Sequence, residues 1–179
     1  MIAIRRVSTK ELSRAEVDVL RRLFAAAWGE DGTFHESDWE HAKGGVHVLV
    51  EDDGEILSHG SVVTRTLEID GTPIRTGYVE AVATWPRHQG RGYGTLVMRE
   101  ISDVIRSSYP LGALATGVPE FYERLGWERW RGPTSVRTSN GIERTPDDDG
   151  GIMILRTPVS PPLDLAAPIA CDWREGDVW

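Results

Sequence analysis

The sequence predicts a mixed α/β fold built around one sheet, and three observations support this class. Runs rich in β-branched residues, separated by turn signals, fill the front half of the chain. Amphipathic segments of helical period precede and follow those runs. The 179 residues, 40% of them apolar, suit one globular domain spanning 1–179.

The expected strands share a run of apolar or β-branched residues that stops at a turn signal. In chain order they cover 2–7, 46–50, 56–67, a run led in by Ile74, 78–84, 111–116 and 152–155. The Asp52-Asp53-Gly54-Glu55 segment is a hairpin signal, because Asp-Gly suits a tight turn with positive φ. Asp70-Gly71 marks a second turn, so the front of the sheet is rich in adjacent strands.

The expected helices begin at recognisable signals. Ser13 and Glu16 form a capping box at the start of the first helix, and a short helix is expected from Ser37. A third covers 93–105, with its apolar residues on one side. Pro119 suits the first turn of a fourth, which is expected to end at Gly126. The later helices therefore lie between strands.

The formal net charge of −8 is concentrated in two segments. Residues 30–40 and 143–179 each carry −5, and the rest of the chain carries +2. This balance disfavours a general nucleic-acid binder, which needs a basic face. Solvated loops are the usual interpretation of such acidic runs, and a pocket for a polycation is the alternative.

Membrane, secreted and metal-binding classes find no support in the sequence. The longest apolar run has five residues, and charged residues follow Met1 too early for a secretory signal. The single Cys171 cannot form an internal disulfide, so we expect a cytoplasmic protein. The four histidines between 35 and 59 match no metal-site spacing, so no metal is expected.

A glycine-rich segment between an expected strand and an expected helix is the candidate phosphate cradle. It reads Arg87-His88-Gln89-Gly90-Arg91-Gly92-Tyr93-Gly94. Glycines let backbone N–H groups approach an anion, and a helix N-terminus adds positive potential. The missing Gly-Lys-Ser/Thr argues against a P-loop, and the spacing differs from the Rossmann fingerprint. An ordinary glycine-rich turn is the alternative.

The spacing Gln89-x-x-Gly92-x-Gly94 resembles the acetyl-CoA pyrophosphate loop of the Gcn5-related N-acetyltransferase (GNAT) superfamily. Phe121 to Trp127 is similar to that superfamily's F-Y-x-x-x-G-F/W segment. The resemblance implies a central, mostly antiparallel mixed sheet flanked by about four helices, with strand 111–116 splaying from 78–84 to admit pantetheine. It implies acetyl-CoA as cosubstrate, bound at Val82, Ala83, Thr84, Arg87, Gln89, Gly90, Arg91, Gly92, Tyr93 and Gly94.

Nearly the whole chain is similar to one family within that superfamily, the aminoglycoside 2′-N-acetyltransferases. The similarity includes Ser37 to His41, Thr145 to Gly150 (TPDDDG) and Cys171 to Trp179 (CDWREGDVW). It implies acetyl transfer from acetyl-CoA to the 2′ amine of an aminoglycoside, which gives antibiotic resistance. The implied substrate contacts are Asp31, Asp38, Glu80, Ala81, Thr116, Asp148, Asp177 and Trp179.

Two residues match the family's catalytic groups. Glu80 matches the acid thought to deprotonate the amine through water, a general-base role. Tyr122 matches the general acid, because a phenol can protonate a departing thiolate. Taken without the resemblance, Glu80 is more simply a strand carboxylate paired with an arginine, and Tyr122 a packed aromatic.

The resemblance also implies a homodimer, with neither nucleic acid nor membrane as partner. Two loops, 29–34 and 115–120, differ in length from the family pattern and should border the antibiotic. Both a deoxystreptamine aminoglycoside and kasugamycin therefore stay open as substrates. The alternatives are another small-molecule or protein N-acetyltransferase on this fold, and a non-catalytic acyl-CoA-binding sensor.

Overall fold

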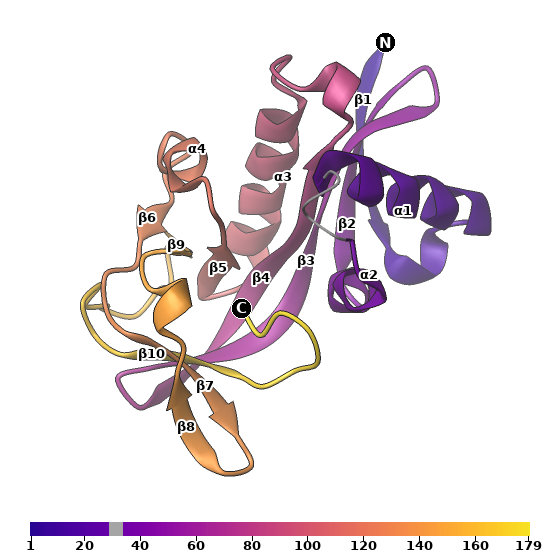
Figure 1. Cartoon of the computed structure of the whole chain (residues 1–179). Helices are drawn as coiled ribbons and strands as arrows, with labels where there is room; N and C mark the ends of the chain where they lie inside the picture. The colour runs from indigo at the N-terminus through magenta and orange to yellow at the C-terminus, as the bar shows by residue number, and fades with distance from the viewer. Residues whose placement is uncertain (29–33) are drawn as a thin grey trace. The chain divides into compact units, whose positions relative to one another are not determined.

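The computed structural model describes residues 1–28 and 34–179, and they divide into two compact units (Figure 1). The first unit comprises Met1–Val63 and Val79–Asp103, and the second comprises Thr64–Tyr78 and Val104–Trp179. Strands β3 (Glu55–Ile69) and β4 (Thr72–Thr84) and helix α3 (Tyr93–Ser108) run from one unit into the other. A single domain over 1–179 stays a prediction.

The first unit contains an antiparallel ladder of three strands. Strand β1 (Ile2–Ser8) pairs with β2 (Val46–Asp52), and β2 pairs in turn with β3. Asp53 and Gly54, both with positive φ, form the tight turn between β2 and β3. This confirms the hairpin that the sequence predicts.

Three α-helices and two 3₁₀ turns accompany these strands: η1 (Thr9–Glu11), α1 (Arg14–Trp28), α2 (Glu36–Ala42), η2 (Pro86–His88) and the first part of α3. The predicted capping box is present at α1. The Ser13 N–H donates to Glu16 Oε2 at 2.7 Å, and the Glu16 N–H donates to Ser13 Oγ at 3.2 Å. Two otherwise unsatisfied groups of the helix end are thereby bonded.

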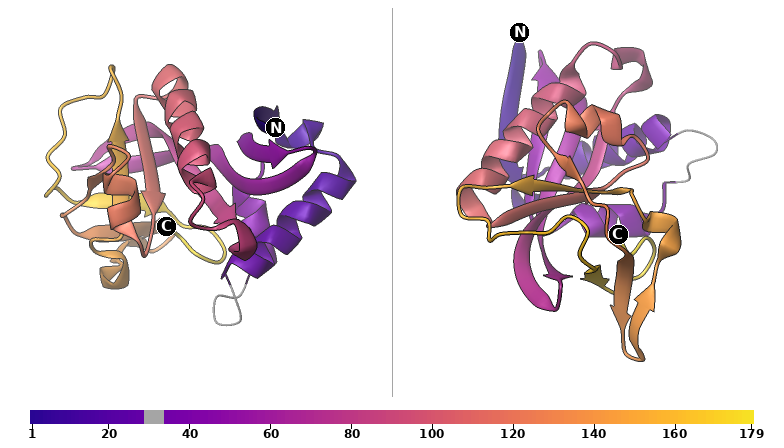
Figure 2. Two further views of the ribbon diagram at one scale, coloured as in Figure 1. Left: turned by 90° about the horizontal axis from the view of Figure 1, so that it is seen from above. Right: turned by 90° about the vertical axis from the view of Figure 1, so that its left-hand side faces the viewer.

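The two faces of the first unit's sheet are covered by different helices (Figure 2). On one face, α1 contributes Phe24 and α2 contributes Trp39 to a buried cluster that includes Leu49 of β2. On the other face, α3 approaches Gly60 so closely that a Cβ there would lie 2.6 Å from Ile101 Cδ1. A side chain at residue 60 would force Ile101 to move, so glycine allows this close packing of helix on sheet.

The second unit contains a mixed sheet whose strand order is β6-β9-β5-β4-β3-β10-β7-β8. Its further strands are β5 (Leu111–Ala115), β6 (Glu128–Arg129), β7 (Thr134–Thr138), β8 (Gly141–Arg144), β9 (Ile152–Arg156) and β10 (Ile169–Asp172). Pairing is parallel between β4 and β5 and between β10 and β7, and antiparallel in β5–β9, β6–β9, β7–β8 and β10–β3. The expected mostly antiparallel mixed sheet is confirmed.

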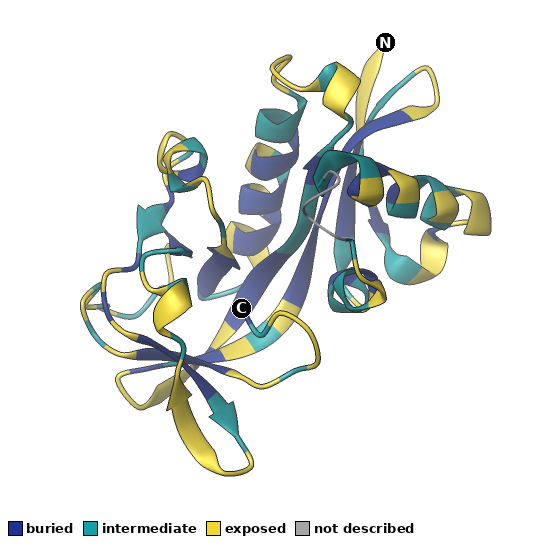
Figure 3. Ribbon diagram, in the orientation of Figure 1, coloured by how far each residue is buried: buried dark blue, intermediate teal, exposed yellow. Residues whose placement is uncertain are grey.

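The second unit also holds α4 (Pro119–Glu123) and the 3₁₀ turn η3 (Pro146–Asp148), each with proline in its first turn. Buried apolar residues of β5 and β9 form the inner layer of this unit, dark blue in Figure 3. The described residues therefore form four α-helices, as expected. None of these helices is long and apolar enough to cross a membrane.

Strands β7, β8 and β10 are not predicted from the sequence, and 74–84 forms one strand instead of two runs. All four residues of β8 are exposed, so no buried alternation marks it. Strand β10 has four residues and pairs with strands distant in sequence. Tertiary pairing, which a local pattern does not encode, decides these elements.

Candidate active site

The glycine-rich segment forms a turn that opens helix α3 in the first unit. Gly90 and Gly92 have φ of 74° and 87°, values that favour glycine. The Leu96 N–H donates to Gly92 O at 3.1 Å, so the helix begins there. A Cβ at Gly90 or Gly92 would meet nothing within 4 Å. The backbone at these two glycines is therefore open, and an N-terminus of a 16-residue helix lies beside it.

Arg87, which is predicted to contact phosphate, has a partner within the protein. Its guanidinium forms an ion pair with Glu55, which lowers the pKa of that carboxyl, and lies 4.8 Å from the Trp85 ring centroid. Arg91 is exposed on the glycine turn. Among the described residues, Arg91 has no such ion pair to break before it meets an anion.

The end of β4 is held by side chains as well as by the sheet. Ser58 Oγ donates to Ala83 O at 2.9 Å and lies 2.7 Å from Thr84 Oγ1. Gln89 Nε2 donates to Thr84 O at 3.2 Å and ties the glycine turn to the strand. Val82 and Thr84 are half-buried. These bonds order the strand end at the residues predicted to bind pantetheine.

Glu80 lies at a distortion in the middle of β4. The next residue, Ala81, has φ of 52°, in the left-handed region that a residue with a side chain rarely adopts. Ser61 Oγ donates to Glu80 O at 3.4 Å, and His59 Nδ1 lies 2.8 Å from Ala81 O. Side chains of β3 therefore bind two successive carbonyl groups of β4, and Glu80 is half-buried at this point.

Tyr122 is buried on α4 in the second unit. Burial raises the pKa of its phenol to about 12, although a hydrogen bond with Thr116 opposes that shift. The Phe121 ring packs edge-on at 4.9 Å, and the Trp127 ring at 6.3 Å. A phenol with a raised pKa keeps its proton near neutral pH, so this site can supply a proton.

The C-terminal residues form an ordered hook in the second unit. Trp179 is 2% exposed, and its indole Nε1 donates to Thr145 Oγ1 at 3.0 Å. The Trp179 backbone N–H donates to Asp177 Oδ1 at 3.2 Å, and Arg174 Nη2 donates to the Trp179 backbone oxygen at 2.9 Å. The Trp179 N–H therefore orients the Asp177 carboxylate, and Arg174 holds the end of the hook.

Asp148 lies next to this hook, because its N–H donates to Thr145 O at 2.9 Å. Partial burial raises the pKa of Asp148, the hydrogen bond with Thr145 lowers it, and repulsion from Asp177 and its two sequence neighbours raises it further. Three of the predicted substrate residues, Asp148, Asp177 and Trp179, are thus brought together around Thr145. The Asp148 and Asp177 carboxylates therefore lie close enough to repel each other, which favours a cation beside them, while the Arg174 guanidinium bonds the end of the hook.

Four other carboxylates of the acidic segments form ion pairs with arginine or lysine. The pairs are Asp149 with Arg144, Asp172 with Arg137, Glu36 with Arg21 and Glu40 with Lys43. Asp149 Oδ1 also accepts the Thr134 N–H at 2.8 Å, so it braces the TPDDDG turn. For these residues, ion pairing within the protein accounts for the acidic charge without a pocket for a polycation.

Asp38 and Asp31 are the residues of the first acidic segment that are predicted to contact substrate, and the structure describes only Asp38. Asp38 accepts the His35 N–H at 2.8 Å and so belongs to the capping box of α2, in the first unit. Asp31 lies outside the described residues. The convergence of the two acidic segments stays a prediction.

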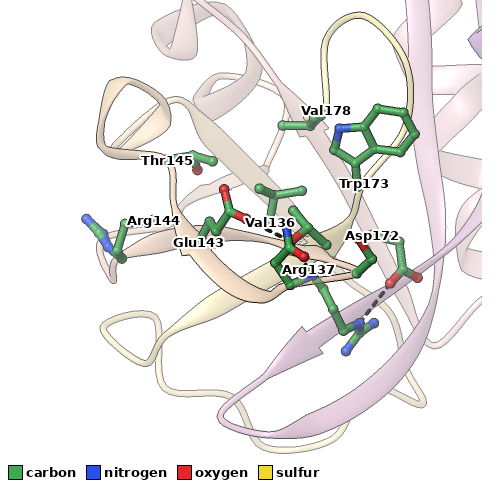
Figure 4. A pocket seen from close by; sticks show the side chains of 11 residues that line it. Val136, Arg137, Glu143, Arg144, Thr145, Asp172, Trp173 and Val178 are labelled. Carbon is green, nitrogen blue, oxygen red and sulfur yellow. Dashed lines mark hydrogen bonds and ion pairs between the residues drawn. The ribbon is translucent and has the colours of Figure 1, made fainter.

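A groove of about 950 Å³ opens between β7, β8 and the C-terminal hook (Figure 4). Trp173 and Val178 line it from the hook side, and Glu143 and Thr145 line it from β8 and the residue that follows. None of the predicted site residues that the structure describes lines it, but Thr145 joins it to the Trp179 indole. Its volume lies in the range of small-molecule sites.

Sequence reasoning missed two groups near the predicted residues. Thr145 anchors the hook, and its position before Pro146 in the TPDDDG block was the available signal. His47 and His59 form a buried pair, each placed in a β-rich run. Across residues 1–28 and 34–179, no group of three or more His, Cys, Asp or Glu is placed to hold a metal ion.

Comparison with known proteins places these features in a family. A family model described as an acetyltransferase (GNAT) domain matches residues 8–130. An aminoglycoside 2′-N-acetyltransferase from Mycolicibacterium fortuitum is 41% identical over 98% of this chain and 91% of its own length.

Solved structures show the same fold at low sequence identity. An Escherichia coli GNAT family N-acetyltransferase in complex with CoA matches with a TM-score of 0.65, 14% identity and coverage of 97% of this chain and 90% of its own. A Brucella melitensis GNAT acetyltransferase in complex with acetyl-CoA matches with a TM-score of 0.63 and 16% identity, and the match covers 95% of each chain. A larger GCN5-related N-acetyltransferase from Kribbella flavida matches with a TM-score of 0.59 and 22% identity. That match covers 74% of this chain but only 34% of the Kribbella chain. These matches confirm the fold that the sequence predicts.

Proposed function

The chain belongs to the acetyltransferase (GNAT) family and, within it, to the aminoglycoside 2′-N-acetyltransferases, and from that premise we propose that it acetylates the 2′ amine of an aminoglycoside. The acetyl donor is acetyl-CoA. The observation that carries this proposal is the identity over 98% of the chain with a relative of that name, combined with the anionic site around Thr145. Aminoglycosides carry several ammonium groups, which a cluster of carboxylates attracts.

The reaction forms one bond and breaks one. The neutral 2′ amine attacks the thioester carbonyl carbon, a C–N bond forms, and the C–S bond breaks to release CoA thiolate. Glu80 takes the amine proton through a water molecule, and Tyr122 gives its proton to the thiolate. The buried Tyr122 phenol is protonated at neutral pH, so the proton is in place before transfer.

The donor's pyrophosphate is proposed to bind at the glycine turn. Open backbone at Gly90 and Gly92, the N-terminus of α3 and the exposed Arg91 support this placement. The pantetheine arm then runs along Val82 to Thr84. Arg87 contributes only if phosphate replaces its ion pair with Glu55.

The acceptor is proposed to contact Asp38, Glu80, Ala81, Thr116, Asp148, Asp177 and Trp179, together with Asp31. Asp148 and Asp177 supply negative charge from the second unit, and Trp179 supplies a fixed aromatic edge. A deoxystreptamine antibiotic is the first choice because several ammonium groups match several carboxylates. Kasugamycin, with fewer amines, is the second substrate to test.

We also propose that the protein works as a cytoplasmic homodimer and gives antibiotic resistance. A single buried Cys171, whose pKa burial raises to about 11, suits a reducing compartment. Size-exclusion chromatography with light scattering tests the dimer, and resistance of cells expressing the protein tests the role.

The catalytic proposal is tested with Glu80→Gln, which keeps the size of the side chain but cannot take a proton. We expect turnover to fall by roughly 10²-fold or more, with the KM for acetyl-CoA unchanged. Thiol release from acetyl-CoA measures both values. Glu68→Gln is the matched control, since Glu68 is on β3 and pairs with Arg137. Equal turnover in wild type and Glu80→Gln would remove Glu80 from the mechanism.

A further inference from the structure

Two buried histidines lie side by side in the first unit. In the antiparallel register, His47 of β2 is opposite Ser61, and His59 of β3 is opposite Leu49. The two imidazoles are therefore diagonal neighbours on one face of the ladder, with ring centroids 5.2 Å apart. Both residues are 0% exposed. Such polar side chains need a hydrogen-bond partner at each buried atom.

A continuous chain of four hydrogen bonds supplies those partners. His59 Nδ1 lies 2.8 Å from Ala81 O, and His59 Nε2 lies 2.9 Å from His47 Nδ1. His47 Nε2 lies 2.8 Å from Thr9 Oγ1, which accepts the Gly44 N–H at 2.9 Å. We call Thr9, His47 and His59 the relay. It begins at the backbone before β2 and ends on the strand that carries Glu80.

Chemistry fixes the direction of every bond in the relay. A carbonyl oxygen only accepts, so His59 Nδ1 carries a hydrogen. Burial lowers the pKa of His47 to about 4 and that of His59 to about 3, so both rings are neutral near pH 7. His59 Nε2 must then accept from His47 Nδ1–H, and His47 Nε2 must accept from the Thr9 hydroxyl. Both rings are therefore Nδ1–H tautomers.

The end of the relay is the most strained backbone of β4. Ala81 has φ of 52°, and a side-chain-bearing residue keeps such a conformation only where its surroundings hold it. The aromatic rings of Phe24, 5.1 Å from His59, and Trp39, 5.9 Å from His47, enclose the pair. In a site this apolar, a directed bond to the Ala81 carbonyl is strong, and losing it is costly.

We propose that Thr9, His47 and His59 are positioning residues that fix the Ala81 carbonyl and thereby hold Glu80 in place to take the amine proton. The relay does not touch substrate. Its hydrogen bonds fix the tautomer of each ring, and the bond from His59 fixes the Ala81 carbonyl of β4. The inference rests on the proposed function only for the role of Glu80.

The tautomers are tested directly, without any substrate. Long-range ¹H–¹⁵N correlation NMR of the full-length protein at pH 7 distinguishes a protonated from an unprotonated ring nitrogen. We expect both His47 and His59 to have protonated Nδ1 and unprotonated Nε2. Thr9→Val, which removes the hydroxyl at constant shape, leaves His47 Nε2 without its donor and should shift the ¹⁵N resonance of that nitrogen, while His59 keeps its Nδ1–H. An Nε2–H tautomer at either ring of the wild type would overturn the proposal.

Kinetics test the consequence for the reaction. Thr9→Val should lower kcat about tenfold while the KM for acetyl-CoA stays unchanged, because misplacement of a catalytic group acts on the chemical step. Thr9→Ser restores the hydroxyl and should restore kcat. Thr66→Val, the same change at an exposed position of β3, should have no effect. Wild-type kcat in Thr9→Val, or no rescue by Thr9→Ser, would refute the positioning role.

Failure of the relay and failure of the proposed function give different results. If Glu80 is not the base, Glu80→Gln keeps its turnover while the two rings still show Nδ1–H tautomers. If the relay is wrong, the tautomers differ or Thr9→Val has wild-type kcat, while Glu80→Gln still loses turnover.

Discussion

The buried histidine pair should make the protein lose stability as the pH falls from 7 to 5. In the unfolded chain each imidazole titrates near 6.5, whereas burial lowers the pKa of His47 to about 4 and that of His59 to about 3. Between these limits the unfolded chain binds more protons than the folded protein. The stability from neutral burial is therefore present above pH 6.5 and is lost as the pH falls toward the folded pKa values.

The size of the effect follows from the pH range over which the unfolded chain binds protons that the folded protein does not. Protonating one histidine in the unfolded state only, between pH 7 and pH 5, lowers the free energy of unfolding by about 2 kcal/mol. The pair therefore accounts for roughly 4 kcal/mol, a large part of the stability of an ordinary domain. Other groups add their own pH dependence, so the comparison must be with a variant that differs in one imidazole.

His47→Asn is that variant, because an amide keeps a donor near the position of Nδ1 but does not titrate. Urea unfolding followed by tryptophan fluorescence at pH 7, 6 and 5 gives the free energy of unfolding of both proteins. We expect the variant to be less stable at pH 7, and to lose about 2 kcal/mol less than wild type between pH 7 and pH 5. Parallel pH dependence in the two proteins would refute the buried neutral state of His47.

Two further predictions concern single side chains. Tyr122→Phe should lower kcat by roughly 10²-fold; because its pKa is raised to about 12, wild-type kcat measured by thiol release should show no falling limb below about pH 10. Thermal unfolding should show Asp149→Asn destabilised by on the order of 1 kcal/mol at neutral pH, since hydrogen bonds from Thr134 and the Arg144 charge lower the pKa of Asp149. That difference should shrink as the pH falls below 3.8, the ordinary Asp value, and an unchanged difference at pH 3 would contradict the bracing role.

Much of the fold is predictable because local signals and tertiary structure agree. The capping box at Ser13 and Glu16, the Asp53-Gly54 turn and the apolar side of α3 each favour the observed element. Strand β8 has no such signal, since it is exposed and stabilised by pairing with β7. Its existence depends on contacts that a local window does not contain.

The site is predictable in composition but not in detail. The resemblance leads to Asp148, Asp177 and Trp179, which the structure brings together. The ion pair of Arg87 with Glu55 depends on a hairpin distant in sequence. The link from Thr9 through two histidines to Ala81 requires three strands and a turn in register. Such connections follow from three-dimensional packing, not from residue spacing.

The central claim is that the chain transfers acetyl from acetyl-CoA to a 2′ amine. The most direct measurement is thiol release with two aminoglycosides that differ only in bearing a 2′-amino or a 2′-hydroxyl group, with mass spectrometry of the product. We expect release only with the 2′-amino compound, and one added acetyl group at that nitrogen. Equal release with both compounds, or acetylation at another amine, would contradict it.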